Sequence, residues 1–143
     1  MFSSKIFKEF APEATCSEAP FQRIPFDEAM LTYGSDKPDL RNPLKIVDVS
    51  EVFAGSEFGI FANTVAAGGF VRAIRAPKTV DKPRSWFDKM NAFAVENEMG
   101  GLGYIVRAAE GNKGPIAKKL DEARLNKLFE LTGTEVGDSV FFV

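Results

Sequence analysis

The sequence contains no histidine. This absence excludes Ser-His and Cys-His nucleophile pairs, imidazole general bases and zinc sites that use histidine. A single cysteine, Cys16, also excludes an internal disulfide, a cysteine-rich metal site and a CxxC redox pair. We therefore expect no catalytic residue, no metal site and no cofactor-binding site within these 143 residues.

Long apolar runs are missing as well. No stretch approaches the roughly 18 apolar residues of a membrane span, and the first ten residues carry charges where a signal peptide needs an apolar core. We expect a reduced, cytoplasmic protein without membrane contact. The 18 Lys and Arg nearly balance the 20 Asp and Glu, so overall charge gives no argument for a nucleic-acid partner.

Hydrophobic residues make up 45% of the chain, which is enough to build the core of one ordinary domain. Phenylalanine dominates the aromatic residues, with fourteen Phe against one Trp and two Tyr. Because a phenyl ring has no polar group to satisfy, we interpret these residues as core side chains. A stacking platform for nucleic-acid bases is the alternative.

Apolar periodicity predicts helices and strands over most of the chain. The expected helices are 2–10, 26–33, a turn at 51–53 capped by Ser50, 85–97 capped by Ser85 with Asp88 completing a capping box, a short piece at 116–120, and 121–131. The expected strands are 44–49, 58–61, 70–75, 102–107 and 140–143. This order predicts an α+β domain in which helices cover a mixed or antiparallel sheet. The apolar strand that ends the sequence suggests a cut at a domain edge.

Residues 34–43 separate two parts of the chain. They hold two prolines and four charges, which is typical of an exposed loop or linker. We place a domain boundary near Pro43, with a helical arm at 1–43 and a domain at 44–143. Within the loop, Asp36 and Asp39 flank Lys37 and could hold a cation or an amine, or could cap backbone amides.

Two glycine-rich segments do not fit nucleotide loops. Residues 100–103 follow a helix and precede a strand, which is the reverse of the dinucleotide fingerprint, so we expect a helix stop and a turn. Residues 111–115 lack the Gly-Lys-Ser/Thr ending of a P-loop and include Pro115, which has no amide donor. We expect an ordinary loop over 110–115.

Positive charge is concentrated between residues 72 and 89, where six basic residues face only two acidic ones. Such a stripe would hold an RNA backbone by counterion release without reading its sequence. A solvated surface around a loop is the other interpretation. If the stripe contacts tRNA, the candidate residues are Arg72, Arg75, Lys78, Lys82 and Arg84.

Residues 21–41 include a long, distinctive string, whose junction residues are Gly34, Ser35, Asp36, Lys37, Pro38, Asp39 and Arg41. This string resembles the stretch of bacterial-type, class II aspartyl-tRNA synthetases that leads from the catalytic core into a large insertion. The following segment resembles the GAD domain inserted in those enzymes, on Val47-Asp48-Val49, Phe58, Phe61, Gly103-Tyr104-Ile105, Pro115-Ile116-Ala117-Lys118 and Ser139-Val140-Phe141-Phe142.

The resemblance implies a piece of a larger, homodimeric ligase that joins aspartate to tRNA with ATP and Mg²⁺. The partners it implies are tRNA and the remainder of the synthetase. The motif 2 and motif 3 arginines of that family have no counterpart here, so no catalytic residue is carried over. Residues 1–43 would then be core helices separated from their sheet, which would leave Phe2, Phe7 and Phe10 partly without partners. In isolation we expect this arm either to be mobile or to dimerise through its apolar face.

Three functions are therefore weighed. The first is the insertion domain of an aspartate-tRNA ligase, inactive alone, with a tRNA-positioning or structural role. The second is a stand-alone α+β module that binds a protein partner without RNA contact. The third, an independent small-molecule enzyme, lacks histidine, a phosphate loop and paired carboxylates.

Overall fold

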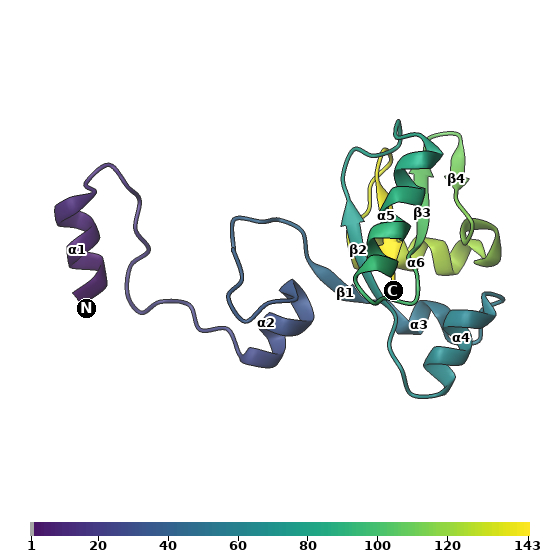
Figure 1. The fold of residues 1–143 in the computed structure, drawn as a ribbon, viewed down its shortest axis with the longest axis horizontal. Coiled ribbons are helices and arrows are strands. Elements are labelled where there is room, and N and C mark those ends of the chain that lie inside the picture. The colour runs from purple at the N-terminus through teal and green to yellow at the C-terminus, as the bar shows by residue number, and fades with distance from the viewer. Residues whose placement is uncertain (1) are drawn as a thin grey trace.

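The computed structural model describes residues 2–143 and places an extended helical arm beside a sheet-containing domain (Figure 1). The arm holds α1 (Phe2–Phe10) and α2 (Phe26–Tyr33), as the apolar spacing predicted. Gly34 ends α2 in the left-handed conformation, and its N–H donates to the carbonyl of Met30 at 3.0 Å. In Figure 1, α1 lies at the far left, away from the sheet, whereas α2 lies close to β1.

Among residues 2–143, five strands form one antiparallel sheet in the order β1-β2-β5-β3-β4. Their bounds are β1 Ile46–Asp48, β2 Arg72–Ala76, β3 Gly103–Ala108, β4 Gly111–Lys113 and β5 Ser139–Phe142. The last strand in sequence is the central one in space, because β5 pairs with β2 and β3 and buries all four of its residues. The predicted α+β class, with an antiparallel sheet, is confirmed.

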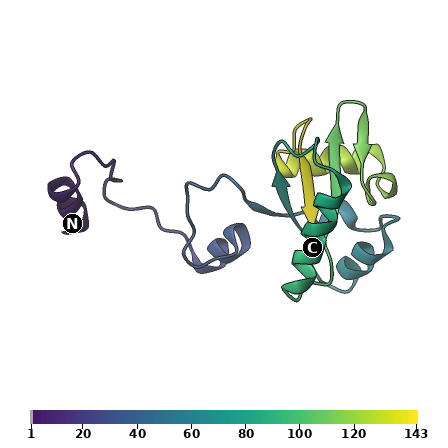
Figure 2. The same cartoon turned by 45° about the horizontal axis from the view of Figure 1, so that its top comes forward.

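Helices cover both faces of the sheet, as Figure 2 shows. On one face lie α3 (Ser50–Phe53), α4 (Gly59–Ala66) and α6 (Glu122–Thr132), whose apolar residues form the larger core cluster. On the other face lies α5 (Arg84–Glu96), whose Phe87 packs with Phe141 and Val106 in a smaller cluster. The short 3₁₀ helix η1 (Ala117–Lys119) precedes α6. No helix in the described range is long and apolar enough to cross a membrane.

The predicted strand at 58–61 is wrong, because these residues begin α4. Phe58, Phe61 and Val65 recur at three- and four-residue spacing, so one helical face carries all three toward the larger core. The rings of Phe58 and Phe61 meet edge to face at a centroid distance of 4.9 Å. Phe61 packs in the same way on Phe53 at 5.0 Å.

The loop predicted at 110–115 is also wrong in part. Its first half is β4, which forms a hairpin with β3 through the pairs Val106↔Lys113 and Ala108↔Gly111. Gly111 makes the tight turn possible with a φ of 132°, a conformation that disfavours side chains. The polar sequence of this strand hid it, because β4 is an exposed edge strand with no buried face.

Both predicted serine caps are wrong. Ser50 lies inside the first turn of α3, and its hydroxyl accepts a hydrogen bond from the N–H of Val71 at 2.9 Å. Helix α5 begins one residue before Ser85 and has no side-chain cap, so Asp88 completes no capping box. The end of α5 at Glu96 is within one residue of the prediction, but Glu98 takes the left-handed conformation after the helix (φ 64°), and Gly101 (φ 130°) lies in the turn before β3.

Candidate functional site

The candidate basic stripe does not form one surface. Arg72 and Arg75 both lie on β2, but side chains alternate between the faces of a strand, and the two arginines are three positions apart, which is an odd number. Arg72 lies on the α5 face beside Ile74, and Arg75 lies on the α6 face with Ala73. A phosphate backbone on one face of the sheet therefore cannot contact both.

Ion pairs occupy both arginines. Arg72 lies 3.3 Å from the Asp48 carboxylate on the neighbouring strand and stacks over the Phe70 ring at 5.1 Å. Arg75 donates to Glu135 at 2.9 Å, and its Nε lies 2.7 Å from Asp138, an ion-pair distance without good hydrogen-bond alignment. The carboxylate partners neutralise positive charge that would otherwise attract RNA.

Asp138 fixes the loop that follows β2. Its side chain, 5% exposed, accepts backbone N–H groups of Lys78 and Glu135, each at 2.9 Å. Burial alone would raise the pKa of Asp138, but these hydrogen bonds and the Arg75 charge outweigh it and lower the pKa below its usual value. The carboxylate is therefore charged at neutral pH and holds Lys78 in a left-handed conformation with φ 56°.

Lys78 and Lys82 on this loop and Arg84 at the start of α5 remain as an exposed group. The loop backbone is held by Thr79, whose N–H donates to Gly137 at 3.0 Å and whose hydroxyl donates to Ser139 at 2.8 Å. Within residues 2–143, these three side chains make one ionic contact, the loose pair Arg84–Asp88 at 3.9 Å. These three side chains are thus presented on an ordered support.

The junction loop pairs its own charges. Asp36 contacts Lys37 at 2.8 Å, and Ser35 accepts the Lys37 N–H at 3.1 Å. Asp39 binds Arg41 through two side-chain hydrogen bonds of 2.8 and 2.7 Å and accepts its backbone N–H at 3.0 Å. These hydrogen bonds lower the pKa of Asp39 to about 2. The turn-capping interpretation matches the geometry of Asp39, which accepts a backbone N–H, but not that of Asp36, which within the described chain contacts only the Lys37 ammonium. Among residues 2–143 no cluster of three metal-ligating acidic or thiol groups occurs.

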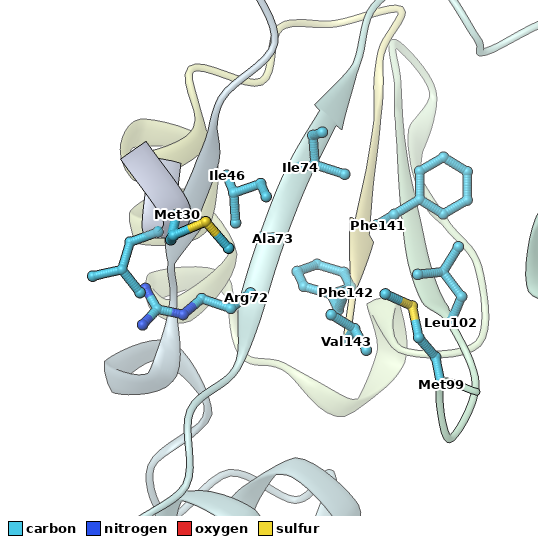
Figure 3. Close-up of a pocket in the computed structure, with 11 residues that line it drawn as sticks. Met30, Ile46, Arg72, Ala73, Ile74, Met99, Leu102, Phe141, Phe142 and Val143 are labelled. Atoms are coloured by element: carbon cyan, nitrogen blue, oxygen red, sulfur yellow. The ribbon is translucent and has the colours of Figure 1, made fainter. Parts of the chain in front are cut away.

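An apolar groove of about 330 Å³ opens on the α5 face, between α2 and the end of the sheet. Figure 3 shows Met30, Ile46, Ile74, Met99 and Leu102 around it, with Arg72 at one side. A second apolar cavity of about 350 Å³ shares Leu102 and Val143 with this groove and extends to Ile60 and Phe70. The exposed apolar surface is therefore continuous around the end of β5, and the sequence patterns did not reveal it because its residues come from six separate segments.

Sequence reasoning also missed a polar cavity beside η1, whose basic side chains are Lys118, Lys119 and Arg124. The signal was present as a lysine pair between residues that the fold buries. Counting local charge did not reveal this pair, because the acidic residues 121 and 122 follow after Leu120 and balance it.

Fold and surfaces together define a small α+β domain joined to a helical arm. A model of the GAD domain family matches residues 61–143. The chain belongs to the GAD domain family.

Curated relatives extend the similarity into the arm. An aspartate--tRNA(Asp/Asn) ligase of Acidiphilium cryptum is 57% identical over 137 residues, which cover 96% of this chain and 23% of that ligase. Ligases of the same name from Paramagnetospirillum magneticum and Gluconobacter oxydans are 55% and 52% identical over 96% of this chain, and it covers 16% and 23% of them. The chain therefore spans a quarter or less of the relatives that it matches, and the expected resemblance to aspartyl-tRNA synthetases is confirmed.

Proposed function

We propose that this chain is the insertion-domain segment of an aspartate-tRNA ligase and that it positions or supports tRNA while other parts of the ligase perform the chemistry. The observation that carries the proposal is the extent of the similarity, which reaches 50% or more over 96% of the chain. It covers the arm and the domain together, so the junction itself is shared with those ligases.

The complete ligase would activate aspartate with ATP and Mg²⁺ and transfer it to tRNA, acting as a homodimer. The names of the relatives include both tRNA(Asp) and tRNA(Asn), and we extend this double specificity to the ligase of which this chain is part. The chain alone is catalytically inactive in this proposal, because the motif 2 and motif 3 arginines lie elsewhere in the ligase. ATP, Mg²⁺ and the amino acid would bind outside these residues.

We place the tRNA-facing surface at the loop after β2, which carries Lys78 and Lys82, together with Arg84 at the start of α5. Of the five candidate residues, these three are exposed and lie on the loop after β2 or at the start of α5, whereas Arg72 and Arg75 are ion-paired on opposite faces of the sheet. Each lysine or arginine that neutralises a phosphate releases a counterion, so the affinity should fall as salt rises.

The test is binding of the chain to a tRNA(Asp) transcript over a salt series, with an unrelated tRNA alongside. The double variant Lys82→Glu/Arg84→Glu should weaken binding. It should also reduce the slope of log K against log salt concentration by roughly 2, the value for two phosphate contacts. The matched control Lys5→Glu/Lys8→Glu reverses the same number of charges on α1 and should have a smaller effect. An unchanged salt slope in the first variant would remove the loop as an RNA contact.

A second candidate function is a protein-binding module without RNA contact. The continuous apolar surface around Val143 favours it, because soluble monomers rarely leave large contiguous apolar patches exposed. Absence of any tRNA binding at low salt, together with loss of ligase activity in the complete enzyme when Met99 is replaced by Glu, would favour this function over the first.

A further inference from the structure

A polar cavity of about 300 Å³ lies between the α3–α4 loop and the start of α6. Gly55 and Glu57 form its wall on the loop side, and Lys118 and Lys119 approach from η1. Asp121 and Arg124, at the first turn of α6, and Ser56 on the loop complete the polar lining. The cavity belongs neither to the basic loop after β2 nor to the apolar groove.

The backbone that carries the two lysines is held by buried neighbours. Ile116, Ala117 and Leu120 are 1%, 7% and 6% exposed, and the N–H of Lys119 donates to Ile116 at 2.9 Å. Because the flanking side chains enter the core, Lys118 and Lys119 project from a fixed 3₁₀ turn. Neither lysine has a carboxylate within 4.0 Å among the residues that the structure describes.

Arg124 is also held in place. Its Nη1 donates to the carbonyl of Val52, and its Nε lies 3.3 Å from Asp121. Asp121 in turn caps α6 by accepting the N–H of Arg124 at 2.8 Å. The Asp121 charge is thus used by the helix cap and the guanidinium, which leaves Glu57 as the exposed carboxylate that faces the two lysines across the cavity.

We propose that this cavity binds one phosphate group of an RNA backbone. Two lysines and the remaining guanidinium nitrogen can donate to phosphate oxygens together, and the positive end of the α6 dipole lies at the same place. Glu57 keeps the net charge of the lining low, so the site suits a phosphate that a larger RNA surface brings to it rather than a free polyanion. The choice of RNA as the source rests on the proposed function.

The geometry gives the ligase a second RNA contact at a distance from the loop at Lys78, Lys82 and Arg84. That loop adjoins the C-terminal side of α6 through Gly137, whereas the cavity lies at the N-terminal end of α6. Two phosphate contacts at separate places fix the direction of an RNA backbone across a domain, which a single cluster cannot do.

The direct test uses the 143-residue chain labelled with ¹⁵N and two probes. A short RNA hairpin should shift the backbone amides of Lys118, Lys119 and Arg124 at concentrations at which equimolar inorganic phosphate does not. The double variant Lys118→Ala/Lys119→Ala should abolish these shifts, and the matched variant Lys5→Ala/Lys8→Ala should retain them. Equal shifts with inorganic phosphate would overturn RNA as the source and assign the cavity to a free phosphate, and no shift with either probe would overturn the site.

The salt series separates this inference from the proposed function. With a tRNA(Asp) transcript, Lys118→Ala/Lys119→Ala should weaken binding several-fold at low salt and reduce the salt slope by about 1, the value for one phosphate. If tRNA binds but the slope does not change, the cavity is not an RNA contact, while the proposed function stands. If tRNA does not bind and the hairpin still shifts the cavity amides, the proposed tRNA role fails, while the phosphate site stands.

Discussion

Phenylalanines have opposite environments in the two parts of this molecule. In the domain, Phe53 is fully buried and packs edge to face on Phe61 and Phe142 at 5.0 and 5.4 Å. In the arm, Phe7 and Phe10 are 54% and 77% exposed. The side chain of Phe2, which the sequence also placed on this face, lies outside the described side chains. The core interpretation therefore holds for most phenylalanines of the domain, with Phe70 and Phe93 exposed as exceptions, and it does not hold for Phe7 and Phe10 of the arm.

The difference shows that an amphipathic pattern specifies a helix but not its partner. Helix α1 has an apolar face, yet no other element in residues 2–143 covers Ile6, Phe7 and Phe10. The domain instead has a core that joins β2, β5 and β3 to helices from distant parts of the chain. Because the relatives are more than four times longer than this chain, we propose that the arm packs in the ligase on residues outside it.

The largest expected effect comes from Phe53→Ala. Removing a fully buried ring should lower the free energy of unfolding of the domain by about 3–5 kcal/mol, whereas Phe10→Ala in the arm should change it by less than about 0.5 kcal/mol. Urea unfolding followed by the fluorescence of Trp86, which lies in the smaller core cluster, measures the domain alone. Equal losses in the two variants would mean that the arm is part of the same folding unit.

Asp138 provides a comparison that depends on pH. Its pKa is lowered in the folded chain, so its contribution is complete above the unfolded pKa near 4 and is lost as the pH falls through the lower folded value. Asp138→Asn should lower the free energy of unfolding by about 1–3 kcal/mol at pH 7. The difference in this free energy between the variant and the wild type should become smaller below about pH 4.

Asp39→Asn is the matched change in the arm. The pKa of Asp39 is also lowered, to about 2, but its carboxylate is paired with Arg41 inside an exposed loop. The urea midpoint of unfolding, followed by Trp86 fluorescence, should therefore be the same in Asp39→Asn and the wild type at any pH between about 3 and 7. If the loss of unfolding free energy in Asp138→Asn does not depend on pH, the hydrogen-bond geometry of Asp138 stabilises the fold and its charge does not.

Elements that depend on local signals could be predicted from the sequence. The bounds of α1 and α2 follow from apolar spacing, from Pro25 at the entry of α2 and from Gly34 at its end. In the domain, α6 was predicted within one residue because Leu125, Leu128 and Phe129 share a face and Gly133 stops the helix. The division near Pro43 stays a prediction, and in the structure the first strand begins at Ile46.

Long-range pairing accounts for what could not be predicted. The position of β5 at the centre of the sheet depends on register with β2 and β3, which no local pattern encodes. Pairing of β1 with β2 places Arg72 beside Asp48, and pairing of β2 with β5 brings Arg75 near Asp138, so two members of the candidate stripe became ion-paired. The cavity at Lys118 and Lys119 likewise needs the α3–α4 loop, which is distant in sequence.

The smallest expected effect is that of removing the arm's first helix and linker. Deleting residues 2–20 should leave the urea midpoint of the domain within experimental error, because no hydrogen bond or ion pair among the described residues joins this segment to the domain. In the intact chain, amides of residues 5–20 should exchange rapidly while those of β5 exchange at the rate of global unfolding.

If the arm instead associates through Phe7 and Phe10, its protection should rise with protein concentration together with the mass measured by light scattering, and Phe10→Asp should remove both. A monomeric chain with a strongly protected arm would contradict both alternatives, because it would require a partner for α1 within the same chain.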